Sequence, residues 1–109
     1  MPQSAVKLLF ASSHSALAAD LEAWLQETAE QVQITGISLD SNEFGHCLAV
    51  LYDLGAGPVY TSRVWFHTQH WGLEEEANAE LLKLSPAKCR LIAIGSNKYG
   101  HCLCVVAET

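Results

Sequence analysis

The spacing of apolar residues along the chain predicts two helices and six strands. Between residues 16 and 31, and again between 73 and 84, apolar residues recur at helical spacing, with acidic residues on the opposite side of each helix. Short apolar runs rich in β-type residues predict the strands. These runs lie at residues 6–11, 32–39, 46–54, 59–68, 89–96 and 101–107.

One segment of ten residues occurs twice. Ser41 to Val50 returns as Ser96 to Val105 with seven identical positions, so we infer an internal duplication. In both copies an Asn is followed by two variable residues and a Gly, which is typical of a type I turn that ends in a bulge. Because apolar runs flank both copies, each is predicted to be the tip of a β-hairpin, with a positive φ at Gly45 and Gly100.

Each half therefore follows the order strand–helix–strand–strand. We expect a single domain of residues 1–109 in which residues 5–53 and 60–108 are repeats related by a pseudo-twofold axis. The fold class is α+β, with internally duplicated β-α-β-β units. The most economical arrangement is a mixed six-stranded sheet with the two helices on one face.

The other face of such a sheet needs a cover. The runs at 46–54, 89–96 and 101–107 are apolar on both sides and do not alternate with polar residues. Two helices can cover only one face of the sheet. The second face is kept from water if the sheet curls into a barrel, if the face lines a pocket, or if it packs against another subunit. We expect the third solution, a homo-oligomer and most simply a dimer that forms through this apolar sheet face.

Composition and charge narrow the class of protein. Half of the 109 residues are hydrophobic and 17% are charged, which is typical of a soluble globular chain. The net charge of −6 argues against nucleic acid and anionic membranes as partners. The first seven residues lack the pattern of a signal peptide, so we expect a cytoplasmic protein whose four cysteines are thiols.

The two His-Cys pairs of the repeat are the first candidates for chemistry. Neighbouring residues of a strand point to opposite faces, so His46 and Cys47, or His101 and Cys102, cannot serve one site together. The pseudo-twofold axis can bring His46 near His101, yet a metal would need further ligands that the spacing does not supply. We therefore predict no metal, no cofactor and no catalytic residue, and packing or turn bracing is the alternative for these pairs.

The aromatic residues Phe44 and Tyr99 occupy the second variable position of each tip. An exposed ring at this position can anchor a partner. The alternative is that the tip folds back and the ring covers the edge of the sheet.

A third cluster lies between residues 65 and 71, where a strand ends and a helix begins. In open α/β sheets ligands bind outside the carboxyl ends of the strands, and a helix N-terminus there favours an anion. The alternative is that the tryptophans are core or interface residues and the histidines are solvated. The candidate ligand- or partner-binding residues of this cluster are Trp65, His67, His70 and Trp71.

These observations favour a small, non-enzymatic binding or interaction module that forms homo-oligomers and holds a small apolar or aromatic ligand between its two repeats. A protein–protein interaction or structural protein without a ligand is the alternative. A small enzyme that uses His and Cys comes third, since the sequence contains none of the common nucleotide, hydrolase or metal motifs.

Overall fold

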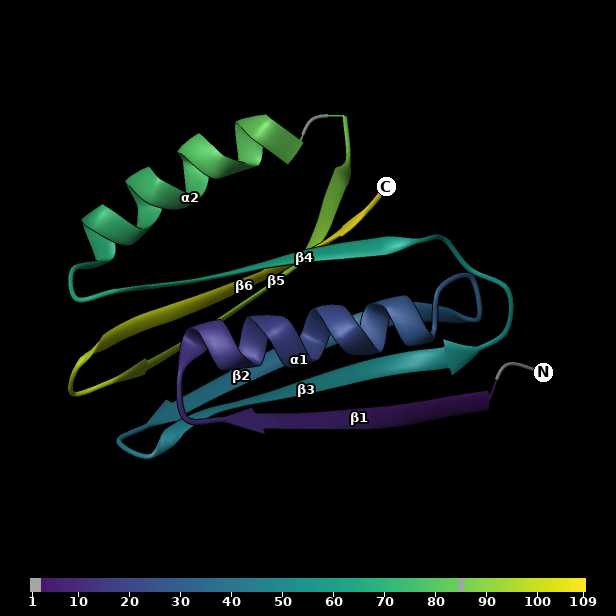
Figure 1. Cartoon of the computed structure of the whole chain (residues 1–109), viewed down its shortest axis with the longest axis horizontal. Coiled ribbons are helices and arrows are strands. Elements are labelled where there is room, and N and C mark those ends of the chain that lie inside the picture. Colours follow the sequence, from purple (N-terminus) through teal and green to yellow (C-terminus); the bar gives the residue numbers. More distant parts are fainter. Residues whose placement is uncertain (1–2, 85) are drawn as a thin grey trace.

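The computed structural model describes residues 3–84 and 86–109, and its elements follow the order β-α-β-β twice (Figure 1). This confirms the α+β class and the duplicated order of elements. The first unit consists of β1 (Gln3–Ala11), α1 (His14–Glu27), β2 (Val32–Asn42) and β3 (Gly45–Leu54). The second unit consists of β4 (Tyr60–His67), α2 (His70–Leu84), β5 (Lys88–Asn97) and β6 (Gly100–Glu108).

The six strands form two antiparallel sheets of three strands, ordered β1-β3-β2 and β4-β6-β5. The single mixed sheet that we expected is therefore corrected. In each unit the hairpin places its last strand between the other two, so the helical crossover never creates a parallel strand pair. The two sheets meet where β2 and β5 run side by side, yet no strand ladder joins these two edges.

Strand pairing shows which residues of the two units are equivalent. Phe10 pairs with Cys47, and Phe66 pairs with Cys102, so Phe10 and Phe66, 56 residues apart, hold the same position. The hairpins match at a spacing of 55 residues. Even the irregularity is duplicated, because β2 and β5 carry a register shift at the same place.

Where the two tips meet, equivalent residues contact each other. The side-chain amide of Asn97 donates to the carbonyl oxygen of Asn42 at 2.8 Å, and Lys98 pairs with Glu43 at 2.9 Å. Both tips therefore lie at the same end of the molecule, with β2 and β5 side by side (Figure 1). The whole units do not follow the expected pseudo-twofold relation, because α1 packs on β4 whereas, among the described residues, α2 makes no comparable contact with β1.

The two helices do not lie on the same face, so the expectation of both helices on one face is wrong. Trp65 of β4 packs with α2, whereas the hydroxyl of Ser62, on the other face of β4, donates to Glu22 of α1 at 2.9 Å. The helices therefore lie on opposite faces of the second sheet. The reason is the relative orientation of the two units, since the helix side of the first sheet faces the side of the second sheet that α2 does not cover.

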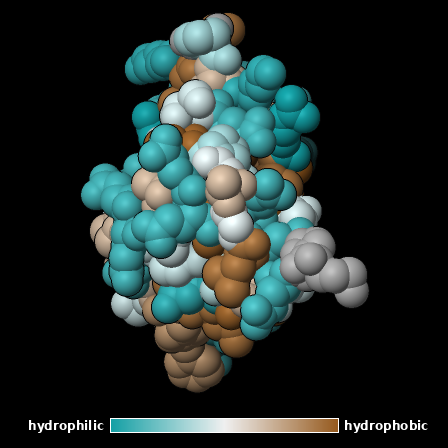
Figure 2. Space-filling view, turned by 90° about the vertical axis from the view of Figure 1, so that its right-hand side faces the viewer, coloured by the Kyte–Doolittle hydropathy of each residue, from teal (hydrophilic) through white to brown (hydrophobic). Residues whose placement is uncertain are grey.

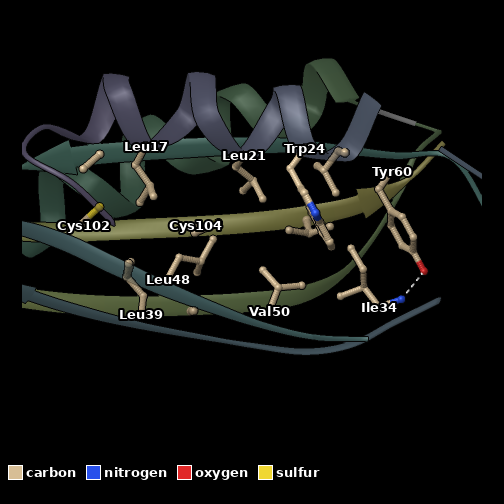
Figure 3. Packing of buried hydrophobic residues seen from close by; sticks show 14 of the residues in the cluster. Leu17, Leu21, Trp24, Ile34, Leu39, Leu48, Val50, Tyr60, Cys102 and Cys104 are labelled. Atoms are coloured by element: carbon tan, nitrogen blue, oxygen red, sulfur yellow. Dashed lines mark hydrogen bonds between the residues drawn. The ribbon is translucent and has the colours of Figure 1, made fainter. Parts of the chain in front are cut away.

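The main core lies between the two sheets and is filled by α1 (Figure 3). Leu17 and Leu21 of α1 are fully buried there. At the edge of this core, the hydroxyl of Tyr60 accepts a bond from the backbone N–H of Ile34 at 2.9 Å. Both units contribute to this core, which includes Leu48 and Val50 of β3 and Cys102, Cys104 and Val106 of β6. A smaller cluster between α2 and the second sheet contains Trp65, Leu73, Ala77 and Val105. Within the described residues, no helix is long and apolar enough to cross a membrane.

Candidate functional site

The two hairpin tips have the turns that the repeat predicts but not the bulge, because Asn42 pairs with Gly45 and Asn97 with Gly100 without a register shift. Gly45 has a φ of 152° and Gly100 a φ of 156°, so the prediction of a positive φ is confirmed. In each tip the Asn side chain accepts bonds from the two backbone N–H groups that follow, at 2.8 and 3.1 Å for Asn42 and at the same distances for Asn97. Both glycines are also needed for space, because a Cβ on Gly45 would overlap the carbonyl oxygen of Ala11.

The repeat also contains a Ser–His pair across the base of each hairpin. The hydroxyl of Ser41 lies 2.7 Å from Nδ1 of His46, and that of Ser96 lies 2.7 Å from Nδ1 of His101. The first pair is buried and the second is exposed. These bonds brace the hairpins and leave Nε2 of each imidazole for other partners.

All five histidines gather at one end of the molecule, where β1 and β4 end, both helices begin and both hairpins turn. They divide into two groups on opposite sides of the second sheet. His14 and His46 lie on the side of α1, while His67, His70 and His101 lie on the side of α2.

A cleft of about 240 Å³, which we call the tip cleft, opens on the α1 side of this end. It lies between the two repeats, because the start of α1, the first tip, β4 and the second tip all line it. The polar lining comes mainly from Ser13, His14, Asn42, His46 and Asn97, and the aromatic lining from Phe66 and Tyr99.

Three rings form one wall of the tip cleft. The imidazole of His14 stacks on Phe66 with centroids 5.9 Å apart, and that of His46 is tilted against the same ring at 5.9 Å. His46 is only 5% exposed. Its burial, and then the proximity of His14, lower its pKa from the ordinary value of 6.5, so this imidazole is neutral at neutral pH.

The predicted cluster at residues 65–71 is divided between core and surface. Trp65 is 4% exposed and packs under α2 as a core residue, whereas Trp71 is 59% exposed. His67 lies against Trp71 with a ring distance of 6.2 Å and accepts a bond at Nδ1 from the backbone of Gln69. His70 instead lies 6.4 Å from His101.

The aromatic residues of the tips are both exposed, Phe44 at 72% and Tyr99 at 56%. Tyr99 lines the tip cleft, and the ammonium of Lys98 lies 5.2 Å from the centre of its ring. Phe44 is not among the residues that line this cleft. The structure thus brings Tyr99 and His46 to one cleft, and places His67, His70, Trp71 and His101 on the other side of the second sheet.

Cys102 and Cys104 behave as small core residues. Burial raises the pKa of Cys102 to about 11, and burial together with the neighbouring Cys102 raises the pKa of Cys104 to about 12. Neither thiol therefore ionises to a nucleophile near neutral pH. In residues 3–84 and 86–109, no three His, Cys, Asp or Glu side chains are grouped so as to hold a metal ion.

A second notable surface is the outer face of the first sheet, the face turned away from α1. Three exposed apolar side chains follow β1 on this face, Val6 at 60%, Leu8 at 65% and Phe10 at 59%. Strand pairing places Leu51, Ala49 and Cys47 of β3 beside them. Hydrophobic atoms also show on the lower part of Figure 2, at the height of the first sheet in Figure 1.

A third surface is the groove of the second unit, a space of about 240 Å³ between α2 and its sheet. Its walls are apolar, and the side chains of Ile92 and Ile94 on β5 are 67% and 58% exposed. The remaining apolar lining comes from Leu73, Ala77, Leu81, Leu103 and Val105.

No known protein family, curated protein or solved structure gives a significant match to the chain. Sequence reasoning missed His14 and Phe66 as residues of the tip cleft. A signal for His14 was present, since a spacing of 56 residues aligns it with the candidate His70.

Proposed function

We propose that the protein is a non-enzymatic binding module of the cytoplasm that assembles with a second copy of itself. One observation carries this proposal. Within one chain, the helix side of the first unit packs against the helix-free face of the second sheet. Because the units are duplicates, the chain also has a second helix side and a second helix-free face, and no described part of the same chain covers these two.

Inside the chain, the helix side of the first unit meets the inner face of the second sheet. The inner face presents Val64 and Phe66 of β4 with Cys102, Cys104 and Val106 of β6. The equivalent positions of the first sheet make up its outer face and are all apolar too. They are Leu8, Phe10, Cys47, Ala49 and Leu51.

The helix side is duplicated in the same way. In the first unit it presents Ile37 and Leu39 of β2 with Leu48 and Val50 of β3. The equivalent residues of the second unit line its groove, and they are again apolar. They are Ile92, Ile94, Leu103 and Val105.

The occupant of each open face is therefore a second copy of the chain. The outer face of one copy packs into the second-unit groove of the other, as the inner face of the second sheet packs against the first unit within one chain. When both contacts form at once, the result is a closed twofold dimer.

Burying the exposed apolar side chains of these two faces releases enough free energy to form a dimer that dissociates on dilution. Burying a fully exposed Val, Leu, Ile or Phe side chain contributes about 1.5–3 kcal/mol. Val6, Leu8, Phe10, Leu51, Ile92 and Ile94 are each about half exposed or more and occur in both copies. Their burial contributes on the order of 10 kcal/mol, which is comparable with the cost of association.

The test uses one lysine on each face. Leu8→Lys blocks the outer face and Ile94→Lys blocks the groove, while Val59→Lys places the same charge on an exposed apolar residue of the loop before β4. We expect wild type and Val59→Lys to have twice the monomer mass of 11.9 kDa in sedimentation at micromolar concentration. Each of the other two variants should be a folded monomer by circular dichroism.

Mixing the two monomeric variants distinguishes this dimer from other arrangements. The mixture retains one intact outer face and one intact groove, so a weaker heterodimer should form. If Ile94→Lys remains a dimer, the outer faces contact each other instead and the proposed contact is wrong. A wild type that sediments as a single species near 12 kDa overturns the dimer itself.

A further inference from the structure

The tip cleft has the features of a built binding site. It is lined by both repeats, and His46 is one of its lining residues although only 5% of that residue is exposed. Nδ1 of His46 is occupied by Ser41 at 2.7 Å. Nε2 is then the imidazole atom left to bind a molecule in the cleft.

A second polar feature lies at the same place. α1 begins at the cleft, with Ser13 as the N-cap, and the Ser13 hydroxyl accepts from the N–H of Ala16 at 3.2 Å. The N–H groups of His14 and Ser15, in the first turn of this helix, have no acceptor within it. These amides and the positive end of the helix dipole favour a negatively charged oxygen.

The remaining wall is aromatic. The ring of Phe66 lies 5.9 Å from the rings of both His14 and His46, and Tyr99 also lines the cleft. The carboxylate of Glu43, which also lines the cleft, pairs with the ammonium of Lys98 at 2.9 Å, and this ion pair reduces its repulsion of an anion. The volume of about 240 Å³ is smaller than a site for a drug-sized molecule, which limits the ligand to a small one.

From this combination we propose that the tip cleft binds a small planar carboxylate, with its carboxyl group at the start of α1 beside Nε2 of His46 and its flat apolar part against Phe66. The inference deepens the proposed binding function by naming a ligand class. It does not depend on the dimer, because a single chain builds the whole cleft.

Binding should be coupled to a proton. The groups around the imidazole of His46 are His14 on α1, Ser41 on β2, and Glu43 with Lys98 at the tips. A bound carboxylate favours the protonated imidazole and opposes the effect of burial. Affinity should therefore increase as the pH falls from about 8 to about 6.

Benzoate is the probe, and the duplication provides matched controls. In NMR titrations of the wild type, we expect benzoate to shift the imidazole signals of His14 and His46 with a Kd on the order of 0.1–1 mM, as befits a ligand of this size. His46→Gln should weaken binding about tenfold or more, the loss of one charge-assisted hydrogen bond. His101→Gln removes the equivalent imidazole outside the cleft and should change the Kd less than about twofold.

Three results would overturn the proposal. These are no shift with benzoate at about 10 mM, equal binding of uncharged benzamide, or equal effects of His46→Gln and His101→Gln. If His46→Gln fails to fold, His14→Gln takes its place, because His14 is partly exposed and its equivalent His70 supplies the control. Benzoate binding is read in the monomeric Leu8→Lys variant as well, so failure of the dimer and failure of the ligand site are separate outcomes.

Discussion

At the scale of single residues, the repeated segment is defined by what each side chain does in the hairpin. The Asn accepts two backbone N–H groups, the Ser binds the imidazole, and the Gly passes close to the strand beside it. The same residue types then acquire different surroundings in the two copies. His46 is buried in a cleft, whereas His101 lies at an exposed Ser–His pair.

Replacing Gly45 by Ala should destabilise the fold, because Gly45 combines a φ of 152° with a backbone carbonyl in the place of a Cβ. We expect a loss of about 1–3 kcal/mol in the free energy of unfolding, measured with urea. Gly36→Ala is the matched control, since no atom lies within 4 Å of its added Cβ. Equal midpoints for the two variants would contradict this role of Gly45.

Turn chemistry is local, and for that reason the tips were predictable from the sequence. The Asn and Gly positions, the hairpins and the positive φ values all follow from four neighbouring residues. The Ser–His bonds were not predicted, although both residues belong to the repeat. The pairing of residues five positions apart becomes visible only when the hairpin register places Ser41 opposite His46.

At the scale of elements, the two helices are equivalent in position but not in burial. α1 packs on both sheets and presents four buried residues, whereas α2 packs on its own sheet and presents three, one of which is Gly72. Apolar periodicity predicted both helices. It does not reveal which helix has a sheet on each side, because that depends on the bend between the two units.

Substitutions at the equivalent residues Leu25 and Leu81 compare how firmly α1 and α2 are packed. Leu25 is 2% exposed in the main core, while Leu81 is partly exposed at the groove. Leu25→Ala should cost about 2–5 kcal/mol in urea unfolding, as for other large-to-small changes in a core. We expect Leu81→Ala to cost about 1 kcal/mol or less when measured in the monomeric Leu8→Lys variant. A cost for Leu81→Ala as large as that for Leu25→Ala would mean that α2 is as firmly packed as α1.

The sheets show where element-level reasoning fails. All six strands were predicted, and the lack of polar alternation correctly indicated apolar residues on both faces. The single sheet with both helices on one face was wrong, because the sequence does not specify how the two units are oriented relative to each other. The contacts of Asn42 with Asn97 and of Glu43 with Lys98 lie where the two tips meet in that orientation.

At the scale of the whole molecule, one shared core joins the two units. Its members include Leu17 and Leu48 from the first unit and Cys104 and Val106 from the second. Neither unit buries these residues alone. Unfolding should therefore be a single cooperative transition and not two.

We expect urea transitions followed by tryptophan fluorescence and by far-ultraviolet circular dichroism to coincide in the monomeric Leu8→Lys variant. Trp24 reports on the main core and Trp65 on the smaller cluster, so the two parts of the molecule are both observed. Two separated transitions would show that the second unit folds independently, and would count against the single domain predicted from the sequence.

The position of β6 has a consequence for synthesis on the ribosome. This strand is the centre of the second sheet and is the last element of the structure to be translated, yet Cys102, Cys104 and Val106 complete the core around α1. Until these residues emerge, the nascent first unit exposes the apolar side of its helix and both faces of its sheet. A nascent chain that still lacks β6 is therefore expected to be prone to aggregation, and codons that slow translation before β6 would lengthen that exposure.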